Sequence, residues 1–319
     1  MTSKTALVFG WNGQDGSLIS KSLLKKNYKV IGFSRNNLDD TNNCVSRDIS
    51  KDIQIEKGDL KNYEIISKLI ESNQPEEIYN LAAQSSVGKS FTNPITSIEG
   101  ITNGTLNILE VARQLNYDGR IFFAGSSEIY GETRRGADIN YKQNPCSPYG
   151  IAKQTSFNLV KLYRELYDIN CVTGILFNHE SPLRNKNFVT HKIISEAIQC
   201  SRNKSHNFKI GNLNISRDWG WAEEYVEAMQ LINRAEKPKD HIICTGILTK
   251  LELFIETVFL KLDLNWKEHI LSDPSLFRKK DIIQSYGNPS DLEKDLRWKA
   301  KVHINEIIEK LIEDKINKL

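Results

Sequence analysis

The sequence predicts an α/β fold: a doubly wound parallel sheet, with a smaller α/β lobe formed by the C-terminal half. Short β-branched runs alternate with longer amphipathic stretches through the first half, which is typical of βαβ units around a parallel sheet. The chain also has 319 residues, enough for one large domain with an appended lobe. We therefore expect residues 1–177 to form the main domain. Residues 178–319 should mainly form the second lobe, with some chain returning to the first.

The expected elements follow from hydrophobic periodicity. We expect strands at 6–9, 30–33, 53–57, 77–81, 120–123 and 171–176, with helices near 16–27, 61–74, 98–115 and 148–168. The second half should hold helices near 188–202, 221–235, 250–261 and 303–317, and minor strands near 208–211 and 241–245. Ligands on such sheets bind beyond the carboxyl ends of the strands, so Gly10, Leu81, Phe123 and Leu176 should rim one crevice.

The composition argues against several classes of protein. The net charge is only +3, and Lys is scattered between Glu and Asp, so we expect a solvated surface and no nucleic-acid partner. The first residues show no signal-peptide pattern, and no apolar run approaches the roughly 20 residues that span a bilayer, so we expect a cytoplasmic protein without a membrane partner. The five cysteines form no CxxC pair, which indicates free thiols and no metal site.

A glycine-rich loop follows the first expected strand. Gly10, Gly13 and Gly16 form the pattern GxxGxxG and open a helix. Glycines at this place permit a tight turn and let the backbone approach a pyrophosphate, which then lies on the helix N-terminus. The alternative is an ordinary turn rich in Gly and Asn. Its position between a strand and a helix favours a dinucleotide site.

The end of the second strand bears on which dinucleotide binds. An acidic residue there would bind the ribose hydroxyls of NAD, whereas this chain has Ser34-Arg35, which suits the 2′-phosphate of NADP. The alternative for Arg35 is a solvated surface residue. Asp59 follows the third strand. It could accept a hydrogen bond from the adenine amino group, or cap the helix that begins near Asn62.

Two further segments carry candidate catalytic residues. Ser126 and Glu128 follow the strand at 120–123, and Tyr149 and Lys153 lie four residues apart, so they share one face of a helix. An ammonium beside a phenol lowers the phenol's pKa, so we expect Tyr149 to act as a base near neutral pH. A YxxxK pair is common by chance. Combined with the glycine loop and the serine-rich segment, it indicates an active site.

These residues together carry a resemblance to a known family. The glycine loop, Ser126 and Tyr149-x-x-x-Lys153 resemble the extended short-chain dehydrogenase/reductases, and within them the GDP-mannose 4,6-dehydratases. The most specific matches are Phe-Asn-His-Glu-Ser-Pro at 177–182 and Arg-Asp-Trp-Gly at 217–220, and further matches reach residues 296–299. Glu128 distinguishes the dehydratases from the related 4-epimerases, which have no acid there.

The resemblance implies a Rossmann-type NADP-binding domain, a nucleotide-sugar lobe and a mechanism. Tyr149 would take the proton of the sugar 4-hydroxyl while hydride passes to NADP. Glu128, with Ser126, would remove the C5 proton and release water from C6. Lys153 would hold the nicotinamide ribose. The product would be a GDP-linked 4-keto-6-deoxy sugar.

The resemblance also implies ligand-binding residues. The NADP site would comprise Gly10, Asn12, Gly13, Gln14, Asp15, Gly16, Arg35, Asp59, Leu60, Leu81, Ala82, Ala83, Tyr149, Lys153 and His179. His179 would act through its backbone and hold no metal. The GDP-sugar would be held by Ser85, Asn178, Val189, Lys192, Arg217 and Arg278, because guanidinium and ammonium groups suit a diphosphate.

Several residues depart from the family pattern and leave alternatives open. Ser126 replaces a Thr, and Arg35 is followed by Asn36 rather than a second Arg, which predicts a weaker preference for NADP. Residues 37–52 replace a longer tetramer-building arm, so we expect a homodimer, with a homotetramer as the alternative. Gly88 and Lys89 differ near the hexose pocket, so GDP-heptose and GDP-N-acetylglucosamine stay open as substrates. A 4-epimerase or reductase, or a non-enzymatic NADP sensor, are the competing functions.

Overall fold

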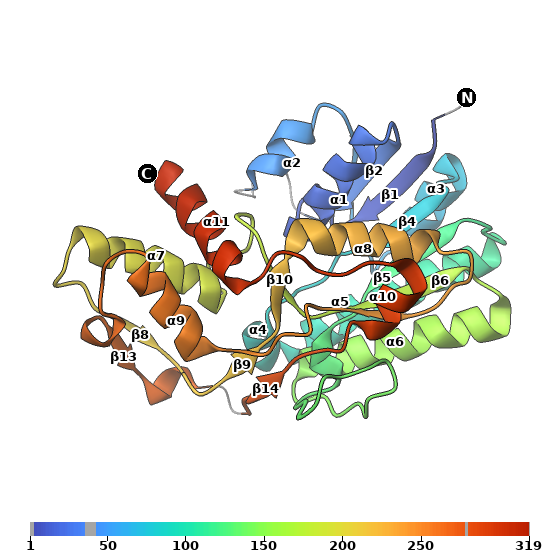
Figure 1. The fold of residues 1–319 in the computed structure, drawn as a ribbon. Helices are drawn as coiled ribbons and strands as arrows, with labels where there is room; N and C mark the ends of the chain where they lie inside the picture. The colour runs from blue at the N-terminus through green and yellow to red at the C-terminus, as the bar shows by residue number, and fades with distance from the viewer. Residues whose placement is uncertain (1–2, 36–42, 278–279, 319) are drawn as a thin grey trace.

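A parallel sheet forms the centre of the computed structural model, which describes residues 3–35, 43–277 and 280–318 (Figure 1). Its seven strands have the order β11-β6-β5-β4-β1-β2-β3, and every neighbouring pair is parallel. The strands are β1 (Thr5–Phe9), β2 (Lys29–Ser34), β3 (Gln54–Lys57), β4 (Glu77–Asn80), β5 (Arg120–Ala124), β6 (Cys171–Leu176) and β11 (His241–Ile243). The strand order reverses between β1 and β4, where such sheets bind ligands. The predicted doubly wound α/β fold is confirmed.

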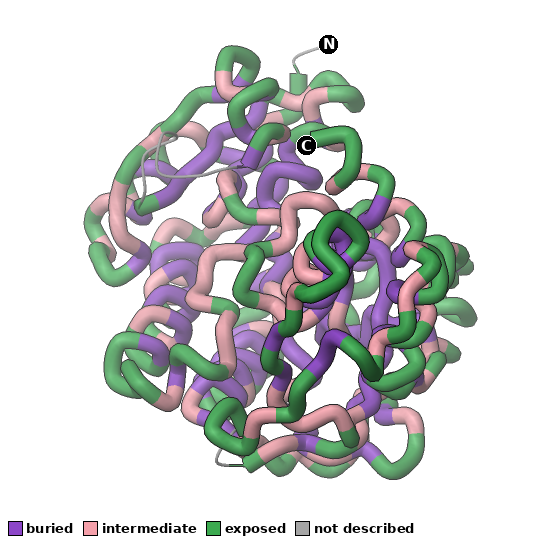
Figure 2. Tube along the Cα trace, turned by 90° about the vertical axis from the view of Figure 1, so that its left-hand side faces the viewer, coloured by how far each residue is buried: buried purple, intermediate pink, exposed green. Residues whose placement is uncertain are grey.

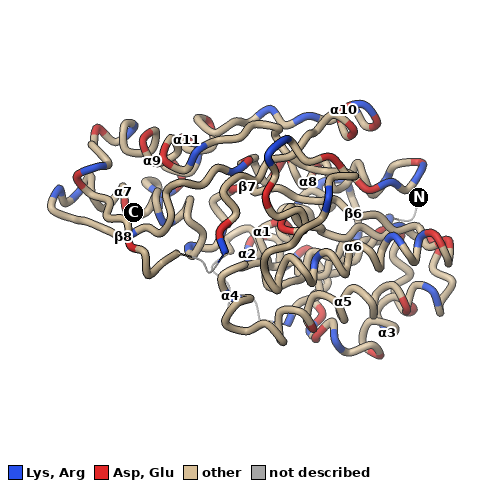
Figure 3. Tube along the Cα trace, turned by 90° about the horizontal axis from the view of Figure 1, so that it is seen from below, with Lys and Arg blue, Asp and Glu red and all other residues tan. Residues whose placement is uncertain are grey.

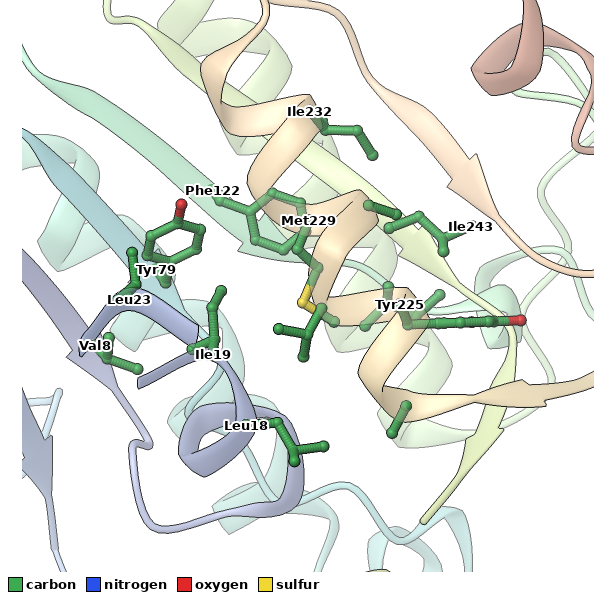
Figure 4. Packing of buried hydrophobic residues seen from close by; sticks show 14 of the residues in the cluster. Val8, Leu18, Ile19, Leu23, Tyr79, Phe122, Tyr225, Met229, Ile232 and Ile243 are labelled. Atoms are coloured by element: carbon green, nitrogen blue, oxygen red, sulfur yellow. The ribbon is translucent and has the colours of Figure 1, made fainter. Parts of the chain in front are cut away.

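Helices cover both faces of this sheet. One face carries α1 (Gln14–Lys25) and α8 (Ala222–Arg234), and the other carries α3 (Tyr63–Asn73), α5 (Pro94–Gln114) and α6 (Pro148–Tyr167). Successive strand residues point to opposite faces. Val8 and Tyr79 therefore pack toward Ile19 of α1 and Met229 of α8, as Figure 4 shows. The residues that precede them in the strands, Leu7 and Ile78, join the core beneath α3, α5 and α6.

A second core holds the C-terminal lobe together. It is formed by apolar residues of α7 (Val189–Arg202), α9 (Leu251–Leu260), α11 (Ile304–Asn317), β8 (Phe208–Ile210), β10 (Trp219–Trp221) and β13 (Ile270–Ser272). Smaller sheets pair β8 with β13, β10 with β7 (Asn178–Glu180), and β9 (Ser216–Arg217) with β12 (Thr249–Lys250) and β14 (Gln284–Ser285). The remaining helices are α2 (Cys44–Ile49), α4 (Val87–Thr92) and α10 (Ser290–Leu296), with short 3-10 turns at Ser127–Ile129, Trp266–Glu268 and Pro274–Leu276.

The eight expected long helices and the six main strands occur within a few residues of their predicted ends. The strand expected near 241–245 occurs as β11, which pairs with β6 and extends the central sheet, and the sequence had assigned it to no particular sheet. Periodicity could not decide this, because a three-residue apolar strand reads the same in any sheet. The division at residue 177 stays a prediction, and α8 and β11 are where later chain joins the main sheet.

The surface formed by the described residues is mixed in charge. Buried chain lies in the interior, and exposed chain lies mostly at the periphery (Figure 2). Acidic and basic residues are interspersed over the helices seen from below (Figure 3).

Within the described ranges, no helix is both long and apolar enough to cross a bilayer.

Candidate active site

A cavity of about 270 Å³ opens beyond the carboxyl ends of β1, β2 and β4. It is lined by Gly10, Asn12, Gly13, Phe33, Ser34, Arg35, Gly58, Asp59, Leu60, Leu81, Ala82, Ala83, Gln84, Thr96, Ser97, Gly100 and Ile101. Nine of the residues expected to bind NADP are in this set: Gly10, Asn12, Gly13, Arg35, Asp59, Leu60, Leu81, Ala82 and Ala83. Sequence patterns did not identify four other lining residues: Thr96, Ser97, Gly100 and Ile101. The signal that could have identified them was the run of small and polar residues at the start of α5.

Two glycines of the loop cannot be replaced without moving the backbone. Gly10 has φ +80°, and a Cβ there would come within 2.8 Å of the Ala82 backbone. A Cβ on Gly16 would lie 2.1 Å from the Gly10 carbonyl oxygen. The loop therefore packs tightly against α1 and the end of β4. That close approach is the geometry a pyrophosphate-binding turn needs.

The N-terminus of α1 suits an anion. Its N-cap is Gly13, and no side chain of the described chain caps it. A Cβ on Gly13 would meet only the Gly10 carbonyl oxygen, at 3.3 Å, so the approach to the helix end is otherwise open. Backbone N–H groups and the helix dipole both favour a phosphate there. The residues present thus fit a dinucleotide.

Arg35 and Asp59 line this cavity just after the ends of β2 and β3. The Arg35 guanidinium is 3.9 Å from the Asp59 carboxylate, and both side chains are exposed. Asp59 accepts a hydrogen bond from the Lys61 N–H at 2.9 Å, whereas Asn62 caps α3 through the Ile65 N–H. The alternative expectation that Asp59 caps α3 is therefore wrong. Asn62, which directly precedes α3, is its N-cap residue.

A charged pair joins the glycine loop to β7. His179 Nε2 lies 3.0 Å from an Asp15 carboxylate oxygen, and His179 Nδ1 lies 2.7 Å from the Phe177 carbonyl oxygen. Both ring nitrogens of His179 therefore face an oxygen atom. Burial alone would raise the pKa of Asp15, but the charge and hydrogen bond of His179 lower it to about 2. Gln14 Nε2 donates to the His179 carbonyl oxygen at 3.4 Å, and the expected backbone contact of His179 with the cofactor stays a prediction.

The expected catalytic side chains lie together. Ser147 caps α6 by accepting the Gly150 N–H at 3.0 Å, and Pro148 opens the helix, which sets Tyr149 in its first turn. Ser126 lowers the pKa of the Tyr149 hydroxyl and the negative charge of Glu128 raises it, so both groups act on this phenol. Ser126, Glu128 and Tyr149 therefore converge at the carboxyl edge of β5.

The expected pKa of Tyr149 is corrected by the structure. Burial raises the pKa of Tyr149 to about 12, and the charges of Glu128 and Asp15 add to the rise, while Ser126 and Arg184 oppose it. The Lys153 Nζ donates to the Ala124 carbonyl oxygen at 2.7 Å and lies 5.8 Å from the centre of the Tyr149 ring. Burial lowers the pKa of Lys153 to about 8. The pKa of Tyr149 is thus raised, not lowered as predicted, because desolvation of the phenol is the largest effect on it, and the contribution of Lys153 stays a prediction.

The residues expected to hold the nucleotide sugar lie on several elements. Asn178 begins β7, Val189 begins α7, and Ser85 is exposed between β4 and α4. Arg217 is buried on β9, with one guanidinium nitrogen 2.9 Å from the Ser216 carbonyl oxygen. The Lys192 ammonium donates to the Lys209 carbonyl oxygen at 2.5 Å. Arg278 lies outside the described residues. In the described ranges, no group of three or more His, Cys, Asp or Glu could hold a metal ion.

Arg184 is a site residue that the sequence reasoning missed. Its guanidinium lies 3.8 Å above the Phe188 ring, and its charge lowers the pKa of both Tyr149 and Asp15. It therefore lies close to the proposed base and to the glycine loop. The signal was a basic residue just after the 177–182 motif, but sequence spacing did not show that the 181–188 turn reaches the active site.

Comparison with known proteins identifies the family. Residues 7–311 match the family described as GDP-mannose 4,6 dehydratase. GDP-mannose 4,6 dehydratase 1 of Arabidopsis thaliana is 34% identical, covering 98% of this chain and 89% of that protein. The human GDP-mannose 4,6 dehydratase is 32% identical, covering 96% and 90%. A dTDP-glucose 4,6-dehydratase structure from Bacillus anthracis superposes with a TM-score of 0.85 at 17% identity, covering 99% of this chain and 97% of that one, and shows the shared fold. The chain belongs to the GDP-mannose 4,6-dehydratase family.

Proposed function

We propose that the chain is a hydro-lyase that converts a GDP-linked hexose, GDP-mannose first, to its 4-keto-6-deoxy derivative through a bound NADP. One observation carries this proposal. Ser126, Glu128 and Tyr149 converge beside the glycine-loop cavity, so a hydroxyl, a carboxylate and a phenol can reach one sugar ring. The family membership supports the same reaction and the same substrate.

The cavity supports NADP as the cofactor. Gly10, Gly13 and the open start of α1 would hold its pyrophosphate, and Ala82 and Ile101 would line its course toward Lys153. Ser34 and Arg35, at the end of β2, would hold the 2′-phosphate, where an acidic residue would repel it. When bound, NADP accepts a hydride from sugar C4 and later returns it to C6.

Tyr149 would act on the sugar 4-hydroxyl. Its phenolate oxygen would take the hydroxyl proton, and Ser126 would donate a hydrogen bond to the same sugar oxygen. The pKa of about 12 that burial imposes has to fall for this step. Ser126 and Arg184 already act in that direction.

Glu128 would carry the elimination. The C4 ketone acidifies the C5 proton, which the Glu128 carboxylate would remove. The C6–oxygen bond then breaks, and the leaving hydroxyl takes a proton from Glu128 to depart as water. A proton returns to C5 in the last step. An epimerase or reductase needs none of these transfers, so Glu128 favours a dehydratase over both.

The nucleotide would lie across the second lobe. Asn178, Val189, Lys192 and Arg217 would contact it, and Arg217 is the buried cation of this set. Lys192 would exchange its contact with the Lys209 carbonyl for a phosphate oxygen.

The sugar itself is the least constrained part of the substrate. A Cβ on Gly88 would meet only Ser86 Oγ, at 3.8 Å, so this part of α4 leaves space. A larger sugar would find room there, so GDP-heptose and GDP-N-acetylglucosamine remain the second candidates for the substrate. The test is to incubate the purified chain with each of the three GDP-sugars and read the product masses. Loss of one water from GDP-mannose supports the proposal. Reaction with UDP- or dTDP-sugars only would contradict it.

We also propose a homodimer that forms through α5 and α6. These neighbouring helices expose Ile95, Ile98 and Leu106 on one, and Ile151, Leu162 and Leu166 on the other, at spacings that place each set on one helix face. An exposed apolar surface of this kind marks an interface. Sedimentation should give a dimer for the wild-type chain and a monomer for Leu162→Glu. A wild-type monomer would contradict the proposal.

A further inference from the structure

Asn43 lies outside the motifs of the cofactor and catalytic sites. Its side chain makes hydrogen bonds to the backbone of the glycine loop. It is 7% exposed and precedes α2. Its amide nitrogen donates to the Asn12 carbonyl oxygen at 3.2 Å, to the Gly13 carbonyl oxygen at 3.1 Å and to Ser17 Oγ at 2.9 Å. One amide group thus contacts both peptides that lead into α1 and the first turn of the helix.

These contacts determine where the loop's N–H groups point. In a trans peptide the C=O and N–H bonds point in opposite directions. The Gly13 carbonyl oxygen is held by Asn43 and by the Ser17 N–H at 3.0 Å, so the N–H of Gln14, in the same peptide, points the other way, out of the helix start. A rotated peptide would instead turn a carbonyl oxygen toward a phosphate and repel it.

Ser17 extends this restraint into the helix. Its hydroxyl accepts from Asn43 and donates to the Gln14 carbonyl oxygen at 3.0 Å. The side chain is fully buried, so water does not compete for these bonds. Asn43 therefore restrains the orientation of consecutive peptides in the turn.

We propose that Asn43 is a positioning residue of the phosphate-binding loop, which keeps the N–H groups at the start of α1 directed at the cofactor pyrophosphate. The inference rests on the proposed dinucleotide cofactor. It adds a role for the segment between β2 and β3, which had been expected only to affect oligomerisation. Asn43 touches no ligand itself and acts through the loop backbone.

Asn43 also caps α2, and the two roles can be separated. Its Oδ1 accepts the Ser46 N–H at 3.1 Å, whereas its Nδ2 holds the loop. Asn43→Asp and Asn43→Ser both keep an oxygen that can cap the helix and remove the amide donor. Asn62→Asp makes the same change at the cap of α3, which the glycine loop does not use, and is the matched control.

The experiment compares two ligands by titration calorimetry. NADP⁺ contains a pyrophosphate, and adenosine 2′-monophosphate occupies only the adenosine end of the cavity. We expect Asn43→Asp and Asn43→Ser to weaken NADP⁺ binding roughly tenfold. This is about the effect of losing one or two ordinary hydrogen bonds, and both variants lose the amide that bonds the two loop carbonyls. Adenosine 2′-monophosphate should bind all variants alike, and Asn62→Asp should bind both ligands as the wild type does.

Equal loss of both ligands, or wild-type NADP⁺ affinity in both Asn43 variants, would overturn the inference. The serine variant keeps the test decisive if the aspartate variant fails to fold. If the wild-type chain binds NAD⁺ instead, the same comparison is made with NAD⁺ and adenosine, which lacks the pyrophosphate. A wild-type chain that binds neither dinucleotide would overturn the proposed function and this inference with it.

Discussion

The His179 ring lies 3.0 Å from the Asp15 carboxylate and stacks on Tyr225, so it joins the start of α1 to β7 and to α8. This pair puts a negative charge in the first turn of a helix that is proposed to hold a pyrophosphate. His179 lies against this carboxylate and lowers its pKa by charge and hydrogen bonding. Without it, a buried carboxylate would face the phosphates unpaired.

A pH dependence of folding follows from this pair. The pKa of Asp15 in the folded chain is about 2, below its usual 3.8, so the pair stabilises the fold above about pH 4 and loses its effect as the pH falls toward 2. We expect Asp15→Asn to remove up to ~2 kcal/mol of this acid-dependent stability. Urea unfolding at pH 5 and pH 2.5 measures it. The difference in free energy of unfolding between wild type and variant should be smaller at pH 2.5 than at pH 5. The same difference at both pH values would contradict the role given to this pair.

Variants of Tyr149 and Glu128 should distinguish the proposed base for the 4-hydroxyl from the proposed base for the C5 proton. Tyr149→Phe should lower kcat at least ~100-fold, because it removes the group that takes the 4-hydroxyl proton. Its affinity for the GDP-sugar should stay within about twofold of the wild-type value.

Glu128→Gln should also lose turnover, and solvent deuterium should no longer enter C5 of the recovered sugar. Measured kcat and mass spectra test both. Product formation by Tyr149→Phe at the wild-type rate would exclude that role.

Removing the Arg184 charge should change the pH profile of the reaction. Arg184 lowers the pKa of Tyr149, so that pKa should rise in Arg184→Gln. The reaction needs the deprotonated phenol, and the acidic limb of kcat/KM should therefore move to higher pH. Arg135→Gln, whose guanidinium lies over Tyr141 at 5.8 Å, is the control and should keep the wild-type profile. An unshifted limb in Arg184→Gln would show that the charge does not act on the base.

Two glycine substitutions should have opposite effects on stability. A Cβ on Gly16 would lie 2.1 Å from the Gly10 carbonyl oxygen, so Gly16→Ala has to displace the loop and should cost about 2 kcal/mol or more. A Cβ on Gly100 of α5 would meet nothing within 4 Å, so Gly100→Ala should stabilise the chain by ~0.5 kcal/mol. Thermal unfolding measures both. A fully stable Gly16→Ala chain would mean that the loop is not tightly packed.

The sequence determined more of the cofactor cavity than of the catalytic chemistry. Alternating strands and helices predicted the sheet. The carboxyl ends of parallel strands meet at one edge, so residues after β1, β2, β3 and β4 could be assigned to one crevice. Motifs at 126–128 and 149–153 could be assigned to the same edge for the same reason. Such inferences need only local periodicity and the direction of the strands.

The rest depended on tertiary packing. Periodicity cannot decide which sheet a three-residue strand joins, so β11 was predicted as a strand but assigned to no sheet. Desolvation by burial is the largest effect on the pKa of Tyr149 and reverses the predicted shift, and the Lys153 ammonium bonds the Ala124 carbonyl oxygen. Asn43 and Arg184 reach the site from turns whose course the sequence does not specify. Spacing along the chain fixes neighbours within a helix or strand, whereas contacts between distant segments exist only once the core has packed.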